Sequence, residues 1–104
     1  MSPRLTLLAG PAVDADVESA FDWYEAERPG LGLEFLDEVR DTYRRILNGP
    51  LHYQDLRSGV RRALLRRFPY GVFFSCEKDD VLVILAVLHT SRNPEEWQRR
   101  IPDR

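Results

Sequence analysis

A histidine, an arginine and a tryptophan follow one another closely near the end of the 104-residue chain. His89, Arg92 and Trp97 stand in the stretch LAVLHTSRNPEEW, directly after a run of apolar residues. Histidine titrates near neutrality and can act as a general acid or base, arginine binds carboxylates and phosphates, and an indole can stack on a base. The stretch predicts a chemical site or a partner contact, against the alternative that His89 ends a strand and Trp97 packs a helix onto the sheet.

Four arginines form a second group in two adjacent pairs, Arg61 and Arg62, then Arg66 and Arg67. On one continuous strand, Arg62 and Arg66 would share one face, and Arg61 and Arg67 the other. One face is expected to pair with the acids of residues 37–41, and the other to line an exposed electropositive surface that contacts a partner. The open alternative is a solvated edge strand whose charges discourage aggregation.

The composition, 43% hydrophobic and 31% charged, is that of a globular domain. Its length predicts one domain over residues 1–104. The lone cysteine and the absence of a signal or membrane-span pattern predict a cytoplasmic protein without a membrane partner. Residues 1–50 carry five basic and ten acidic side chains, and residues 51–104 carry ten basic and seven acidic. Since the net charge is −2, any electropositive function must be local.

We expect no cofactor and no metal. His52 lies outside any ligand spacing that would hold a metal ion, and no serine stands in a recognisable nucleophile–base motif. Cys76 alternates with Val72 and Phe74, and this pattern predicts a thiol in the core.

Two helices are expected after a short strand at residues 4–8. Apolar residues recur at helical spacing over residues 13–24 and again over 35–47. Prolines and glycines end both segments. Because the break at residues 28–32 is short, the two helices are expected to form an antiparallel hairpin.

The second half of the chain predicts strands at residues 60–68, 70–76 and 81–88. An antiparallel meander of these three, completed by the N-terminal strand, gives a four-stranded sheet covered on one face by the hairpin. The last strand is apolar throughout and is expected to be covered on both faces. Asn93 and Pro94 suit the start of a short C-terminal helix. The fold class is therefore α+β.

These segments, in this order, resemble the RelE/ParE superfamily of toxins from type II toxin–antitoxin modules. The matching residues read RRFPYGVFFSCEKDDVLVILAVLHTSRNPEEW, with ERPGLGLEFLDEV between the helices, and the likeness spans residues 4–99. The resemblance implies a small toxin held inactive by a cognate antitoxin, with which it would form a hetero-oligomer. RelE-like members cleave mRNA on the ribosome, whereas ParE-like members bind DNA gyrase and have no recognised catalytic residues.

Three positions favour the ParE-like branch. The RelE-like branch has an arginine where Gly71 follows Tyr70, and glycine has neither a charge to hold the scissile phosphate nor a side-chain proton donor. It has a tyrosine where Trp97 stands, and an indole is neither a general acid nor a base. Another ribonuclease subgroup ends its last strand with histidine and tyrosine, but here Thr90 follows His89. The sequence therefore predicts a binding toxin rather than an enzyme.

Two alternatives stay open at this point. The chain could be a RelE-like, ribosome-dependent mRNA endonuclease, with His89, Arg92, Arg61 and Arg67 as its catalytic residues. It could also be a non-toxic relative that only binds an antitoxin and takes part in transcriptional autoregulation.

An antitoxin would leave its mark on the surface. A segment that folds on binding is expected to lay an amphipathic helix or an extended strand over apolar grooves. The edge of the strand at residues 60–68 and the helix-margin residues Trp23, Leu31 and Leu33 are the candidate contacts.

Overall fold

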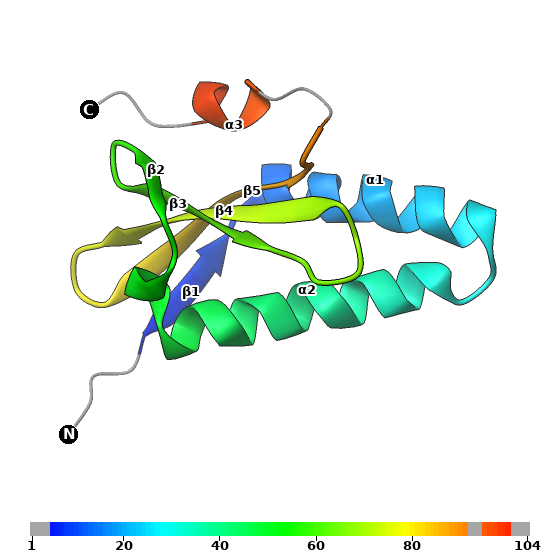
Figure 1. Ribbon diagram of the computed structural model, residues 1–104, viewed down its shortest axis with the longest axis horizontal. Coiled ribbons are helices and arrows are strands. Elements are labelled where there is room, and N and C mark those ends of the chain that lie inside the picture. The colour runs from blue at the N-terminus through cyan, green and yellow to red at the C-terminus, as the bar shows by residue number, and fades with distance from the viewer. Residues whose placement is uncertain (1–4, 92–94, 101–104) are drawn as a thin grey trace.

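The computed structural model describes residues 5–91 and 95–100, which form a five-stranded sheet with α-helices on both faces (Figure 1). Along the chain the elements are β1 (Thr6–Ala9), α1 (Pro11–Glu27), α2 (Leu31–Asn48), the 3₁₀ turn η1 (Pro50–His52), β2 (Asp55–Arg57), β3 (Val60–Leu64), β4 (Tyr70–Glu77), β5 (Val81–His89) and α3 (Glu96–Arg99). The predicted α+β class and helical hairpin are confirmed. None of the described helices is long and apolar enough to cross a lipid bilayer.

The hairpin of α1 and α2 follows from its terminal residues. Pro11 begins α1, where its missing N–H would have had no partner. The chain then turns at Gly30, whose φ of 91° favours glycine. The Glu25 carboxylate accepts the N–H groups of Gly30 and Gly32 at 3.0–3.1 Å. These bonds satisfy donors at the start of α2 that have no partner within the helix.

The sheet has the strand order β1-β5-β4-β3-β2. The meander of β3, β4 and β5 is antiparallel as predicted, and β1 pairs with β5 in parallel. The expectation of four strands is wrong, because β2 adds a fifth beyond β3. β2 is short and mostly polar, so it lacks the apolar alternation that marks a strand in a sequence. A tight turn at Ser58 and Gly59, both with positive φ, joins it to β3.

The basic strand is shorter than predicted, because β3 ends at Leu64 instead of continuing to residue 68. The following residues form a loop that returns to β4, closed by the Leu65 N–H bonded to the Tyr70 carbonyl at 2.9 Å. Leu65 and Phe68 turn inward from this loop and are buried. Burial of these two side chains therefore outweighs continuation of the strand.

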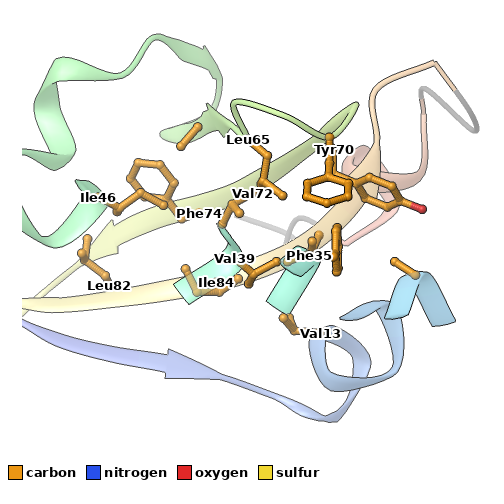
Figure 2. Packing of buried hydrophobic residues seen from close by; sticks show 14 of the residues in the cluster. Val13, Phe35, Val39, Ile46, Leu65, Tyr70, Val72, Phe74, Leu82 and Ile84 are labelled. Atoms are coloured by element: carbon orange, nitrogen blue, oxygen red, sulfur yellow. The ribbon is translucent and has the colours of Figure 1, made fainter. Parts of the chain in front are cut away.

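The two faces of the sheet have different covers. On one face, α1 and α2 enclose the main core, in which Phe35, Ile46, Phe74, Leu82 and Ile84 are fully buried (Figure 2). On the other face, α3 lies over a smaller cluster of Val60, Phe73 and Ala86 (Figure 1). We call these the hairpin face and the α3 face. Since β5 contributes to both clusters, the prediction that it is covered on both faces is confirmed.

Cys76 corrects a third expectation. Its thiol is exposed rather than in the core. The alternation with Val72 and Phe74 holds along β4, but Cys76 comes near the end of the strand, where the burial pattern ends. A period-two pattern gives the face of a residue, and it does not give the point at which the cover of that face ends.

Candidate functional site

The arginines predicted as a contact site are divided between the two faces of the sheet. Along β3, Arg61 shares the hairpin face with Ala63, a residue of the main core. Arg62 shares the α3 face with Val60, a residue of the smaller cluster. Arg66 lies beyond the strand in the loop and is exposed. The four arginines therefore do not form one continuous surface.

Arg67 and Arg61 are engaged within the protein. The backbone N–H of Arg67 donates to both carboxylate oxygens of the buried Glu38, at 2.9 and 3.0 Å. The Arg67 guanidinium also donates to Glu34 at 3.2 Å. This bond, together with a second from Arg28, holds the pKa of Glu34 below its usual value. Arg61 donates to the Tyr53 carbonyl at 2.5 Å.

Of the acids in residues 37–41 that were expected to pair with this set, Glu38 does so. Asp37 and Asp41 instead form ion pairs with arginines of their own helix, at 3.5 Å each.

Arg62 crosses over the strand beside it. A Cβ placed on Gly71 would lie 3.1 Å from both Cγ and Cδ of Arg62. Glycine at position 71 thus leaves room for the aliphatic stem of Arg62 to lie across β4. Within residues 5–91 and 95–100, no carboxylate pairs with Arg62. The α3 face therefore carries a guanidinium, which belongs to Arg62 of β3 and not to an arginine at position 71.

His89 lies on the hairpin face. It ends β5 and lines a cavity of about 250 Å³ together with Asp16, Ser19 and Tyr70. Its ring meets the Tyr70 ring edge-on at 5.3 Å. The Ser91 backbone N–H donates to His89 Nδ1 at 3.2 Å, so this nitrogen carries no proton and the neutral ring has its hydrogen on Nε2. His89 and its cavity lie on the opposite side of the sheet from Arg62.

Trp97 packs α3 onto the sheet. Its ring stacks on Phe73 with the centroids 5.4 Å apart and the planes 11° apart. Trp97 is half-buried in the smaller cluster. This agrees with the alternative stated above, that Trp97 packs a helix onto the sheet. Arg92, Asn93 and Pro94 lie outside the described residues, so the contact predicted for Arg92 and the helix start predicted at Asn93 stay predictions.

One partly buried ion pair was not foreseen. The carboxylate of Asp16, on α1, and the guanidinium of Arg100, just after α3, form two bonds of 2.7 and 2.8 Å. The hydrogen bonds that Arg100 donates to Asp16 raise the pKa of Arg100 above its ordinary value. The two residues are 84 positions apart. No local pattern connects them, and only the folded chain brings them together.

An apolar groove runs along the outer side of the hairpin. A hollow of about 390 Å³ lies between α1 and α2, with Val17, Phe21, Leu36 and Val39 among its lining residues and Asp14, Glu18 and Arg40 charged at its margin. Of the predicted antitoxin contacts, Trp23 and Leu33 are exposed, whereas Leu31 packs against the core. The predicted edge is half-closed, because β2 pairs with Val60 and Arg61 and not with the rest of β3.

The described side chains do not assemble a recognisable catalytic group. Among residues 5–91 and 95–100, no three His, Cys, Asp or Glu side chains converge as metal ligands would. The candidate cation Arg62 and the candidate acid His89 lie on opposite faces of the sheet. The described surface carries the partly exposed Arg62 guanidinium, the apolar groove between α1 and α2, and exposed apolar side chains that include Trp23 and Leu33.

The fold is shared with chains in solved structures of toxin–antitoxin systems. A solved structure titled the chromosomal ParDE system from P. aeruginosa superimposes with a TM-score of 0.73 and 20% identity, covering 85% of this chain and 98% of that chain. The RelBE2 toxin–antitoxin complex from Mycobacterium tuberculosis superimposes with a TM-score of 0.56 and 19% identity, covering 83% and 98%. No curated protein matches the chain by sequence.

The family follows from a separate comparison. The family described as ParE toxin of the type II toxin–antitoxin system, parDE, matches residues 9–94. The chain belongs to this family. The resemblance seen in the sequence is thereby confirmed, including its preference for the ParE-like branch.

Proposed function

We propose that this protein is a cytoplasmic toxin that inhibits DNA gyrase by binding, and that a cognate antitoxin neutralises it. The observation that carries the proposal is the division of candidate residues between the two faces of the sheet. RNA scission needs a group that transfers protons close to a group that holds the scissile phosphate. His89 faces α1, whereas Arg62 lies on the α3 face beside Gly71.

The place of Trp97 supports the same proposal. The RelE-like branch has a tyrosine at this position, and here an indole is stacked on Phe73 at 5.4 Å. An indole engaged in packing supplies neither a proton nor an anion for catalysis. Membership of the ParE family agrees with a toxin that acts by contact.

The test uses the purified protein in two assays. We expect loss of DNA supercoiling by gyrase at toxin concentrations that leave mRNA on translating ribosomes uncut. Specific mRNA cleavage with normal supercoiling would overturn the proposal in favour of an endonuclease. Failure of both assays, together with normal growth when the gene is induced without its neighbour, would indicate a non-toxic relative.

Two variants make the test sharper. His89→Ala removes the imidazole that lines the cavity beside α1, and a binding toxin is expected to keep most of its activity without it. Arg62→Ala removes the partly exposed guanidinium of the α3 face, and we expect weaker gyrase inhibition if this face contacts the target. Arg44→Ala is the matched control, because Arg44 is an exposed arginine on α2.

The antitoxin is proposed to bind the outer side of the hairpin. The solved structures with this fold include a toxin–antitoxin complex. The groove between α1 and α2 has an apolar floor with Glu18 and Arg40 at its margin. An amphipathic helix could lie there with its apolar face down and charged rows over this margin.

Charge reversal tests this surface without disturbing the core. Glu18→Arg and Arg40→Glu change side chains that are exposed, so the fold should be retained. We expect each to weaken the binding of the neighbouring gene product by about tenfold, since rim charges set orientation and partner choice. Unchanged affinity in both variants would place the antitoxin elsewhere. We also expect the toxin to be less soluble and to melt lower alone than in its complex.

A further inference from the structure

The edge of β5 is left uncovered where β1 stops. β1 pairs with β5 in parallel from Val81 to Ile84, and the last pair joins Ala9 to Ile84. The chain then leaves the sheet at Gly10 and begins α1, whereas β5 continues for five more residues to His89. From Leu85 onward, the backbone groups on this edge have no neighbouring strand among the described residues. A buried backbone group without a partner is costly, so these groups need another solution.

Side chains supply that solution. The Val87 N–H donates to Asp16 Oδ2 at 3.0 Å. The Leu85 carbonyl accepts from Arg100 Nη1 at 3.2 Å. In a parallel sheet, one residue of the neighbouring strand bonds a carbonyl and an N–H that are two residues apart. Asp16 and Arg100 therefore occupy the places that the next residue of a longer β1 would have taken. Leu85 is also the extra residue of a β-bulge, because Ile84 and Ala86 pair with consecutive residues of β4.

The same two side chains join three elements. Asp16 belongs to α1 on the hairpin face, and Arg100 follows α3 on the opposite face (Figure 1). Their bidentate pair, at 2.7 and 2.8 Å, reaches across the edge of β5. Only 21% of the Arg100 side chain and 10% of the Asp16 side chain are exposed. Charge-assisted, bidentate and largely shielded pairs are the strong ones.

α3 needs such an anchor. A helix of four residues is far too short to be stable by itself. Its tertiary contacts among the described residues include the stack of Trp97 on Phe73, the Asp16–Arg100 pair and a long bond of 3.4 Å from Arg57 to Gln98. Arg99, beside Arg100, has Glu96 of the same helix, at 3.3 Å, as its ion-pair partner within the described part of the chain.

We propose that Asp16 and Arg100 form a latch that completes the open edge of β5 and holds α3 over the α3 face. When the latch is closed, Trp97 covers Phe73, and the apolar cluster of this face is shielded. When the latch opens, α3 leaves the sheet, and the edge of β5 and the cluster beneath α3 become accessible together. This inference is independent of gyrase or any other target.

The test follows Trp97 and the Val87 amide. In a Trp23→Phe background, Trp97 is the only tryptophan, since the chain has two. We expect Arg100→Ala to shift the Trp97 emission to longer wavelength and to speed hydrogen exchange at the Val87 amide by about tenfold. Arg99→Ala is the matched control and should change neither. An Arg100→Ala protein that matches the Arg99→Ala control in both measurements would overturn the proposal.

Two further variants separate the latch from general stability. Asp16→Asn keeps an oxygen for the Val87 N–H but removes the charge that holds Arg100, so it should shift Trp97 emission with less effect on Val87 exchange than Asp16→Ala. Arg100→Lys keeps the charge but cannot make the bidentate pair and the Leu85 bond together. We expect an intermediate shift of emission with an unchanged circular dichroism spectrum. If Arg100→Ala fails to fold, Arg100→Lys decides: emission and exchange equal to the parent would refute the latch.

Discussion

The two faces of one sheet are covered in very different ways. The hairpin face lies beneath α1 and α2, and its core includes Phe35, Phe74 and Ile84, with exposed fractions of 0–2%. The α3 face lies beneath a single helical turn, and Trp97, which covers it, is itself only half-buried. β4 and β5 contribute to both clusters, so the strands cannot account for the difference.

This difference indicates a division of tasks. Long helices that are close in sequence enclose one face, and their packing supplies most of the stability. The other cover is short, comes from the end of the chain and depends on a ring stack and one ion pair. We expect substitutions on the hairpin face to unfold the domain, whereas substitutions on the α3 face should change its surface while the domain stays folded.

Phe35→Ala should have the largest effect. The Phe35 ring lies among Tyr24, Phe68 and Tyr70, with centroids 5.1–5.4 Å away, and is fully buried. Its truncation leaves a cavity and should lower the free energy of unfolding by about 3–5 kcal/mol. Urea denaturation followed by circular dichroism measures this loss. Leu33→Ala on the same helix removes a side chain that is 60% exposed and should cost far less; equal losses would contradict a core centred on Phe35.

Glu38→Ala should cause the second-largest loss of stability. The Glu38 carboxylate accepts the Arg67 N–H on both oxygens and is 9% exposed. Its removal leaves that N–H without a partner, so the free energy of unfolding should fall by about 1.5–3 kcal/mol. Glu34→Ala is the matched control, because Glu34 pairs with the same arginine at an exposed position. Exposed pairs contribute little, so a Glu34→Ala loss as large as that of Glu38→Ala would exclude burial as the cause.

Trp97→Ala tests the weaker cover. The stack on Phe73 and the partial burial of the indole should contribute about 1–2 kcal/mol, less than Phe35 does. The domain should remain folded at room temperature and bind more of a hydrophobic dye, because Phe73 becomes accessible. Arg99→Ala, at an exposed position of α3, provides the control. Global unfolding of Trp97→Ala would contradict the proposal that the cover of the α3 face contributes less to stability than the hairpin does.

Regular elements were predictable from the sequence because each carries a long periodic signal. α2 spans 18 residues and β5 spans nine, so their apolar spacing repeats often enough to exceed chance. The terminators were equally clear: Gly30 and Gly49 lie where the chain must turn. The order of these elements then supported the resemblance, and the family comparison confirmed it.

Short elements and distant contacts were not predictable. β2 has three residues and mostly polar side chains, so the turn at Ser58 and Gly59 was its only signal. The Asp16–Arg100 pair joins two ends of the chain, and each residue alone looks like an ordinary surface charge. The candidate site residues lie on different faces for a related reason. Alternation along the strand predicted that Arg61 and Arg62 lie on opposite faces, as they do, but it did not say which face each occupies. The face of His89 became clear only from the pairing of β5 with β4.

Tyr43 gives the smallest expected effect and tests the outer side of the hairpin. Burial, with help from Asp14 and Asp16, raises the pKa of Tyr43 to about 12. In the unfolded chain the phenol titrates near 10, so between about pH 10 and pH 12 the folded state holds the proton that the unfolded state has lost. The contribution of Tyr43 is complete below this window and is lost as pH rises through it.

Tyr43→Phe carries no such proton and should lose less stability over this range than the parent. Urea midpoints measured across the window give the difference, and the ultraviolet absorbance of tyrosinate gives the late titration directly. Asp14→Asn removes one of the charges that oppose ionisation of the phenol and should move this titration to lower pH. If Tyr43→Phe keeps the same fall in stability as the parent, the shielding of Tyr43 between α1 and α2 is weaker than its surroundings indicate, and the hairpin would then be less tightly closed on its outer side than on the side that faces the sheet.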